Sequence, residues 1–402
     1  MNYLTTDTEL TSIADAIREK GGSSSALTYP AGFISAIQDI STMNVKTFVE
    51  NEDWIQDMDT SEITQIRPYA FASCSTLTTA NFPSCTTIGS NAFALCYNLS
   101  SVSFPKCTTI GRSAFYQCSA LESVSFSRCT SINEYAFISC KNLSTISFDN
   151  CTHIGPYAFA SCYALKSVTL SRCTYIPVSA FFHCSSLTDI SFRACTIIDH
   201  SAFAFCRTLK SASFPQCSSV NDCAFYYCTD LSSVSFPQCK SIGHSAFAEC
   251  SSLKEVIFSS CTSIGSFAFA NCSNIGGAAF ERCVYIGHGA FSRCTNLSST
   301  YFPWCMNILD SAFYGCSNIK TLSFSSCRYI GNDAFAYCSS LFSLYITSTN
   351  MVTLAHKNAF AGTPISNYGD IRGSIYVNNS LLENYKTANN SHNKCKIKYK
   401  FI

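Results

Sequence analysis

Apolar side chains recur along this chain in a unit of 22 residues, and each half of the unit has its own spacing. In one unit Val102 and Phe104 are apolar whereas Ser101 and Ser103 are polar, which predicts a short strand with one buried face. The return half, C-x-x-I-G-x-x-A-F-x-x-C, has apolar residues three and four positions apart. That spacing predicts a turn and a short 3₁₀ or helical piece.

The unit repeats without insertion or deletion from about Ile66 to Ile346, and an Ala-Phe pair and two cysteines return in every copy. One unit cannot bury its apolar face alone, so we expect successive units to stack and to bury one another's. In the stacked array like residues form continuous inner rows. The rows are predicted to contain the aromatic rings of Phe93, Phe104, Phe115 and Phe126 and the thiols of Cys96, Cys107, Cys118 and Cys129.

The isoleucine of the return half, such as Ile88 or Ile110, is usually followed by glycine, as at Gly89 and Gly111, and by Asn or Asp in a few copies. Residues of these types favour a backbone with positive φ. Pro177 occupies the same position and contradicts this interpretation, because proline fixes φ near −65°. The sequence therefore leaves open whether the position needs positive φ or only a turn.

The unit I-G-x-x-A-F-x-x-C-x-x-L-x-x-V-x-F-P resembles the BspA-like (Treponema-type) leucine-rich repeat. The resemblance implies an α/β repeat solenoid. Its 22-residue coils would form a right-handed superhelix with a concave parallel β-sheet and a convex side of 3₁₀ and turn structure. It also implies a binding role, often in adhesion. The chain departs from the family pattern in the completeness of its second cysteine column.

Four segments are expected along the chain: a helical segment at residues 1–41, a cap at 42–62, a solenoid of about 13 repeats at 63–348, and a last irregular repeat with its cap at 349–402. Thr6-Asp7-Thr8-Glu9 has the form of a helix capping box. The segment around it is similar to one in tail-associated proteins of phages of gut Firmicutes. A plain N-terminal cap without a phage connection is the alternative.

The amino-acid composition limits the kinds of partner that we expect for this protein. Apolar residues make up 47% of the chain, charged residues only 13%, and the net charge is +1, so we expect no nucleic-acid partner. We see no secretory signal and no apolar run long enough to span or insert into a membrane. Localisation stays open between a virion, a cell surface reached by a non-Sec route, and the cytoplasm.

The 27 cysteines offer the first candidate chemistry. Stacked side chains point in parallel, which favours buried reduced thiols as small apolar fillers over disulfides or a metal site. Cys223 falls outside both columns, in a position that the two neighbouring repeats fill with Ser201 and Ser245, and is the candidate for a reactive surface thiol.

Two surface features remain as candidate sites. A stripe of His200, Asp222 and His244 in successive coils could hold a divalent cation, although a solvated turn column is the simpler reading. Outward strand positions on the concave side form the candidate binding face, although hydroxyls there could equally serve only to solvate the sheet. Aromatics at variable positions, such as Tyr97 and Trp304, suit recognition, with half-buried packing as the alternative for several of them. The predicted binding residues are Ser101, Ser103, Ser123, Ser125, Thr145, Ser147, Glu255, Tyr301 and Tyr345.

No catalytic motif and no cofactor are expected from the sequence. We therefore expect a recognition protein that binds a glycan or protein on a cell surface, as a phage-tail or bacterial-surface component. The alternative is a structural spacer or assembly component that docks through its N-terminal helices.

Overall fold

A computed structural model describes the chain at residues 60–366, 373–391 and 399–401. The expected helical segment at 1–41, and most of the cap expected at 42–62, lie outside these described residues. The chain divides into two units, one ending at Ser171 and the other beginning at Arg172. Each unit is a parallel β-solenoid of 22-residue coils, which confirms the predicted fold class.

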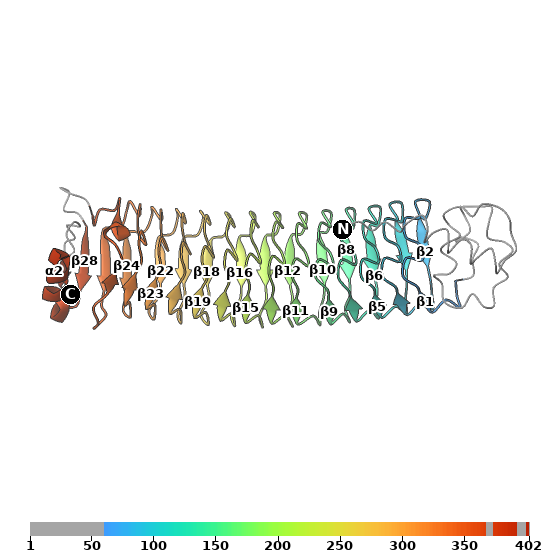
Figure 1. Cartoon of the computed structure of the whole chain (residues 1–402), viewed down its shortest axis with the longest axis horizontal. Helices are drawn as coiled ribbons and strands as arrows, with labels where there is room; N and C mark the ends of the chain where they lie inside the picture. Colours follow the sequence, from blue (N-terminus) through green and yellow to red (C-terminus); the bar gives the residue numbers. More distant parts are fainter. Residues whose placement is uncertain (1–59, 367–372, 392–398, 402) are drawn as a thin grey trace, which may run out of the picture. The chain divides into compact units, whose positions relative to one another are not determined.

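The alternating half of each repeat forms the predicted strand. In the first unit Ser101–Ser103 is β4, Ser123–Ser125 is β6 and Thr145–Ser147 is β8, and β6 and β8 pair in parallel register. Figure 1 shows these strands following one another coil by coil. We call them long strands. They are β2 (Thr79–Asn81), β4, β6, β8 and β10 (Ser167–Thr169) in the first unit, and β12 (Asp189–Ser191), β14 (Ser211–Ser213), β16 (Ser233–Ser235), β18 (Glu255–Ile257), β20 (Gly277–Ala279), β22 (Ser299–Tyr301), β24 (Thr321–Phe324) and β26 (Ser343–Ile346) in the second.

The return half begins with a second, two-residue strand that the sequence pattern did not predict. These short strands pair in parallel with their counterparts in neighbouring coils, for example Thr87↔Thr109 and Ile88↔Ile110. Two residues show no alternation, so pairing between coils alone creates the strand. The short strands are β1 (Gln65–Ile66), β3 (Thr87–Ile88), β5 (Thr109–Ile110), β7 (Ser131–Ile132) and β9 (His153–Ile154), then β11 (Tyr175–Ile176), β13 (Ile197–Ile198), β15 (Ser219–Val220), β17 (Ser241–Ile242), β19 (Ser263–Ile264), β21 (Tyr285–Ile286), β23 (Asn307–Ile308), β25 (Tyr329–Ile330) and β27 (Thr353–Leu354).

The rest of the return half is a chain of turns rather than the short helical piece considered from the sequence. The Ala94 amide donates to the Asn91 carbonyl of its own coil at 3.1 Å, whereas the Phe93 amide donates to the Ala114 carbonyl of the next coil at 2.7 Å. Asn91 and Leu95 have positive φ, 56° and 64°. The left-handed residues turn alternate amides toward the neighbouring coil, so a continuous 3₁₀ ladder cannot form.

Of the two alternatives left open for the glycine column, positive φ is not the one that the structure has. Gly89 and Gly111 have ordinary φ, and positive φ falls two residues later, at Asn91 and Ser113. Space explains the glycine, because a Cβ added to Gly111 would lie 2.6 Å from the carbonyl carbon of Gly89 in the preceding coil. Because the backbone of this column does not need positive φ, the fixed φ of Pro177 is compatible with it.

Phenylalanine rings fill the interior of each coil. Phe93 and Phe115 are fully buried, with ring centroids 5.2 Å apart and planes 3° from parallel. Phe104 and Phe126 form the second row, 5.8 Å apart, and Phe93 contacts Phe104 edge-on at 5.8 Å. The predicted inner rows of Phe are therefore present, and each ring is sandwiched between its equivalents.

The C-terminal elements close the second unit. The delayed Ala359-Phe360 pair lies in η4 (Lys357–Phe360), where the Phe360 ring stacks on Phe335 at 5.6 Å. β28 (Ser374–Val377) pairs with β26, and η5 (Asn379–Leu381), α2 (Leu382–Ser391) and β29 (Tyr399–Phe401) follow. Tyr385 of α2 is buried, and its hydroxyl accepts a hydrogen bond from the Val352 amide at 2.8 Å.

Candidate functional site

The outward positions of the long strands form one surface in each unit, which we call the strand face. In the first unit Ser101 and Ser103 of β4 and Ser123 and Ser125 of β6 are exposed. Thr145 of β8 is exposed and Ser147 is half-buried, and both pair in register with the equivalent residues of β6. The structure therefore places all six predicted residues of this unit on one hydroxyl-bearing surface.

The strand face of the second unit carries the other three predicted residues. Glu255 of β18 and Tyr301 of β22 are exposed and belong to the same three-stranded sheet, with β20 between them. Tyr345 of β26 belongs to a different sheet. Its ring stacks on Tyr376 with centroids 4.6 Å apart, and the Lys400 ammonium lies 5.5 Å from the Tyr376 centroid. Tyr345 is thus a packing residue of the C-terminal end as well as a surface residue.

The candidate metal stripe is a column of turn residues with backbone partners. The Asp222 carboxylate accepts a hydrogen bond from the His244 amide at 2.7 Å, and Asp310 holds the Asn332 amide of the next coil in the same way at 2.8 Å. The His244 ring contacts Phe267 edge-on at 5.8 Å. Among the described residues no group of three or more His, Cys, Asp or Glu side chains could hold a metal ion, His200 included.

The two cysteine columns are buried, and each has its own hydrogen-bond pattern. In one column the thiols of Cys96 and Cys118 donate to the carbonyl oxygens of Phe71 and Phe93 at 2.9 and 3.0 Å. In the other, the Cys107 and Cys129 thiols each donate to the carbonyl of the residue two positions later, at 3.4 Å in both cases. No disulfide joins any of the 26 cysteines in the described part of the chain.

Burial also makes these thiols unreactive. Desolvation raises the pKa of Cys107 to about 12 and that of Cys118 to about 12. The thiolate is the nucleophile, so a thiol that stays protonated at neutral pH reacts slowly. Cys223, the candidate reactive thiol, is only half-buried, yet burial and the neighbouring Asp222 carboxylate raise its pKa as well. The electrostatic surroundings therefore argue against an activated thiol at Cys223.

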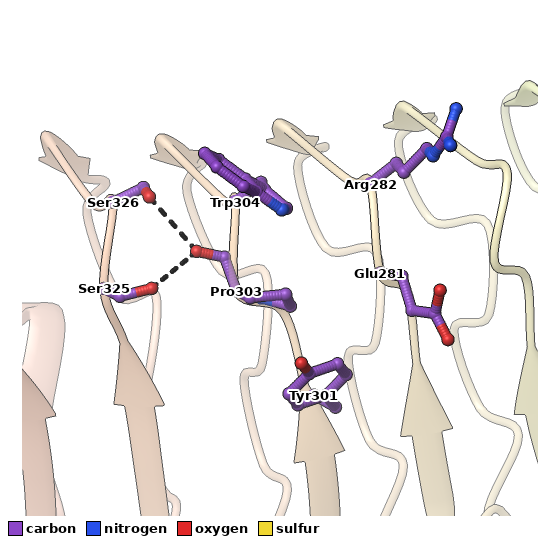
Figure 2. A pocket seen from close by; sticks show the side chains of 7 residues that line it. All are labelled: Glu281, Arg282, Tyr301, Pro303, Trp304, Ser325 and Ser326. Carbon is purple, nitrogen blue, oxygen red and sulfur yellow. Dashed lines mark hydrogen bonds between the residues drawn. The ribbon is translucent and has the colours of Figure 1, made fainter.

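A hollow on the second unit was not recognised as a site from the sequence. It has a volume of about 480 Å³ and is lined by Glu281, Arg282, Tyr301, Pro303, Trp304, Ser325 and Ser326. We call it the aromatic hollow; Figure 2 shows Trp304 and Pro303 leaning from their loop toward the coil of Arg282 and Glu281. Tyr301 and Trp304 were each noted in the sequence, but their proximity depends on the turn after β22. Comparing residues within each column is the signal that could have found them together.

A family comparison matches most of the chain. The matching family is described as "BspA type Leucine rich repeat region (6 copies)", over residues 43–166, 108–232, 174–297, 218–341 and 279–389. The chain belongs to the BspA-type leucine-rich-repeat family. Leucine-rich-repeat proteins of this kind are generally binding and recognition proteins and are typically non-catalytic. No curated protein sequence matches the chain.

One solved structure supports the fold, and two others are similar at lower TM-scores. A leucine-rich repeat protein from Bacteroides ovatus is 23% identical, with a TM-score of 0.58 over 85% of this chain and 88% of that one. A leucine rich cell surface protein from Faecalibacterium prausnitzii is 22% identical over 78% and 82% of the two chains, with a TM-score of 0.36. The pneumococcal vaccine antigen PcpA is 15% identical over 85% and 84%, with a TM-score of 0.37. Within the described residues, no helix is both long and apolar enough to cross a membrane.

Proposed function

We propose that this BspA-type repeat protein is a non-catalytic adhesion or recognition protein that binds a cell-surface glycan or protein along its strand face. The strand face is the observation that carries the proposal. Ser101, Ser123 and Thr145 repeat a small exposed hydroxyl from coil to coil over a fully packed interior. Hydroxyls both donate and accept hydrogen bonds, and a rigid scaffold holds them in register, so a bound partner orders few side chains of the protein.

Steric and charge blocking of the strand face tests the proposal. The full chain is first screened against arrayed glycans and surface proteins at micromolar concentration, and every ligand found is titrated against a variant with Ser125→Arg and Ser147→Arg. Ser125 is exposed and Ser147 is half-buried, and both belong to the strand face in adjacent coils, so we expect binding to fall at least tenfold. His153→Arg, on a short strand, is the matched control and should bind as the parent does.

Two outcomes would contradict the proposal. The first is a screen without any ligand at micromolar concentration. The second is a ligand whose affinity falls with His153→Arg but not with the paired arginine variant, because the binding surface would then lie on the short strands. Thermal unfolding of each variant separates a blocked surface from a damaged fold.

We also propose that residues 1–41 dock the protein to a larger assembly such as a phage tail, with the solenoid as the part that reaches the ligand. The support is the similarity of this segment to one in phage tail-associated proteins. Removing residues 1–41 should abolish incorporation into the particle and leave ligand binding by the solenoid intact. If the truncated protein still assembles, the docking role is wrong. If strand-face variants have no effect on attachment while the truncation does, the solenoid is a spacer.

A further inference from the structure

Two columns of the second unit change residue type at the same place. The third residue of each long strand points outward. It is serine in β12, β14 and β16, then Ile257, Ala279 and Tyr301 in the next three coils, and serine again at Ser323. The loop position after these strands is polar in the coils on either side, Arg282 and Ser326, but is Trp304 between them. In an otherwise regular array, the coils around β22 have therefore acquired aromatic residues that stacking does not require.

These aromatic residues are held out in solvent. Trp304 is 61% exposed and Tyr301 is 57% exposed, whereas Phe302 between them is buried in the interior row with 2% exposure. Large rings exposed to this extent contribute little to the stability of the fold. Contiguous exposed apolar surface is typical of binding sites. Both rings line the aromatic hollow together with Pro303.

The loop that carries Trp304 is fixed from the next coil. The hydroxyls of Ser325 and Ser326 both donate to the Pro303 carbonyl, at 2.7 and 3.1 Å, as the dashed lines of Figure 2 show. On the other side Cys305 and Phe302 anchor the loop in the core. A preorganised loop lowers the entropy that binding must overcome, so the backbone that presents Trp304 is held in place before a ligand binds.

The lining indicates the ligand's chemistry. The charges of Glu281 and Arg282 cancel, and every other lining residue is neutral, so the hollow does not select a strongly charged ligand. Figure 2 shows the Arg282 side chain extending upward and the Glu281 side chain downward from the coil beside that of Trp304, both turned away from the Trp304 loop in this view. A guanidinium only donates hydrogen bonds, a carboxylate only accepts them, and serine and tyrosine hydroxyls do both. Flat apolar rings bordered by such groups fit a sugar, which has an apolar C–H face and a rim of hydroxyls.

The surrounding residues favour a glycan over a protein. Serine is depleted in protein–protein interfaces and rare among their energetic hot spots, yet two serines, Ser325 and Ser326, line the aromatic hollow. We propose that the aromatic hollow binds a neutral oligosaccharide, with a sugar ring stacked on Trp304 and Tyr301 and its hydroxyls bonded by Arg282 and Glu281. This inference rests on the proposed recognition function and names one site and one ligand class for it.

The chain offers its own reporter for the test, because it contains two tryptophans, Trp54 and Trp304. In a Trp54→Phe background, Trp304 emission is recorded during titration with neutral hexose and N-acetylhexosamine oligosaccharides of two to six units, and with uronic-acid oligomers as charged comparators. We expect a neutral oligosaccharide to shift the emission with saturation. Binding of that oligosaccharide, measured by calorimetry, should weaken about tenfold in Trp304→Ser and in Tyr301→Ser. Both changes install the residue of a neighbouring coil, so the fold is retained.

Ile257→Ser is the matched control that separates a glycan from a protein. Ile257 is 60% exposed in the same column as Tyr301 but does not line the aromatic hollow, so oligosaccharide affinity should stay within twofold. The proposal is overturned if no neutral oligosaccharide binds, if Trp304→Ser leaves affinity unchanged, or if a protein ligand proves to be the one that needs Trp304 and Ile257 together. That last result would refute the glycan assignment and leave the recognition function standing. A strand face that binds nothing in the wider screen would instead refute the recognition function itself.

Discussion

Truncating one interior ring gives a direct measure of how strongly adjacent coils hold each other. Phe115 is fully buried, and its ring stacks between Phe93 at 5.2 Å and Phe137 at 5.0 Å. Burial of a phenylalanine contributes about 1.5–3 kcal/mol, and each stacked pair adds about 0.5–1.5 kcal/mol. Phe115→Ala should therefore lower the free energy of unfolding by about 4 kcal/mol, within the range of about 3–5 kcal/mol typical of such truncations.

The assay is urea unfolding of the full chain under reducing conditions, followed by far-ultraviolet circular dichroism. Tyr97→Ala is the matched control, because Tyr97 is an aromatic residue of the same unit that is 48% exposed and should cost less than about 1 kcal/mol. A repeat array can unfold in parts, so the comparison uses the transition that the Phe115 change shifts. Equal small losses for the two variants would refute the idea that stacked rings carry the stability of the coils.

Three further outcomes follow from the packing of the coils. Burial raises the pKa of Cys118 to about 12, so its thiol should stay protonated at pH 8 and should not be labelled by a thiol reagent. Labelling should increase as the pH rises toward 12, or when the protein is unfolded. Rapid labelling of the folded protein at pH 8 would contradict this prediction. Gly265→Ala places a Cβ 2.5 Å from backbone of the preceding coil and should destabilise by about 1–3 kcal/mol, whereas Gly277→Ala, whose nearest neighbour is 3.9 Å away, should be nearly neutral in the same melt. Tyr385→Phe removes the hydroxyl that accepts a hydrogen bond from the Val352 amide, and it should lower the free energy of unfolding by about 1–3 kcal/mol. An unchanged melting temperature would contradict this prediction and would indicate that water takes the place of the hydroxyl.

The sequence predicts the inward-facing half of this molecule well. An apolar position that recurs every 22 residues must meet its own copy in the next coil, so the Phe rows follow from spacing alone. What the spacing does not contain is backbone pairing. The short strands such as Thr87–Ile88 exist because neighbouring coils offer hydrogen-bond partners, and two residues are too few to show a strand pattern.

The glycine column shows why a residue type alone is an ambiguous signal. Glycine is chosen either for positive φ or for the absence of a Cβ, and a single sequence does not separate the two. In the structure Gly89 needs space against the preceding coil, whereas the positive φ two residues later is borne by Asn91, Ser113 and even Tyr135. Intercoil hydrogen bonds such as that of the Asn91 amide to the Arg112 carbonyl, at 2.8 Å, stabilise this backbone, which isolated residues would avoid.

The same distinction bears on where this protein binds. Residues that repeat in every coil satisfy the common requirements of stacking and of a solvated strand face, so they say little about which ligand is selected. A large residue that differs from the equivalent residues of other coils and is exposed to solvent is not required for stacking of the coils. Trp304 meets all three conditions, and two serine hydroxyls from the next coil fix its loop. Under the proposed function, the serine columns are the common background of the strand face, and we expect selectivity for one ligand to come from the few coils that break the repeat.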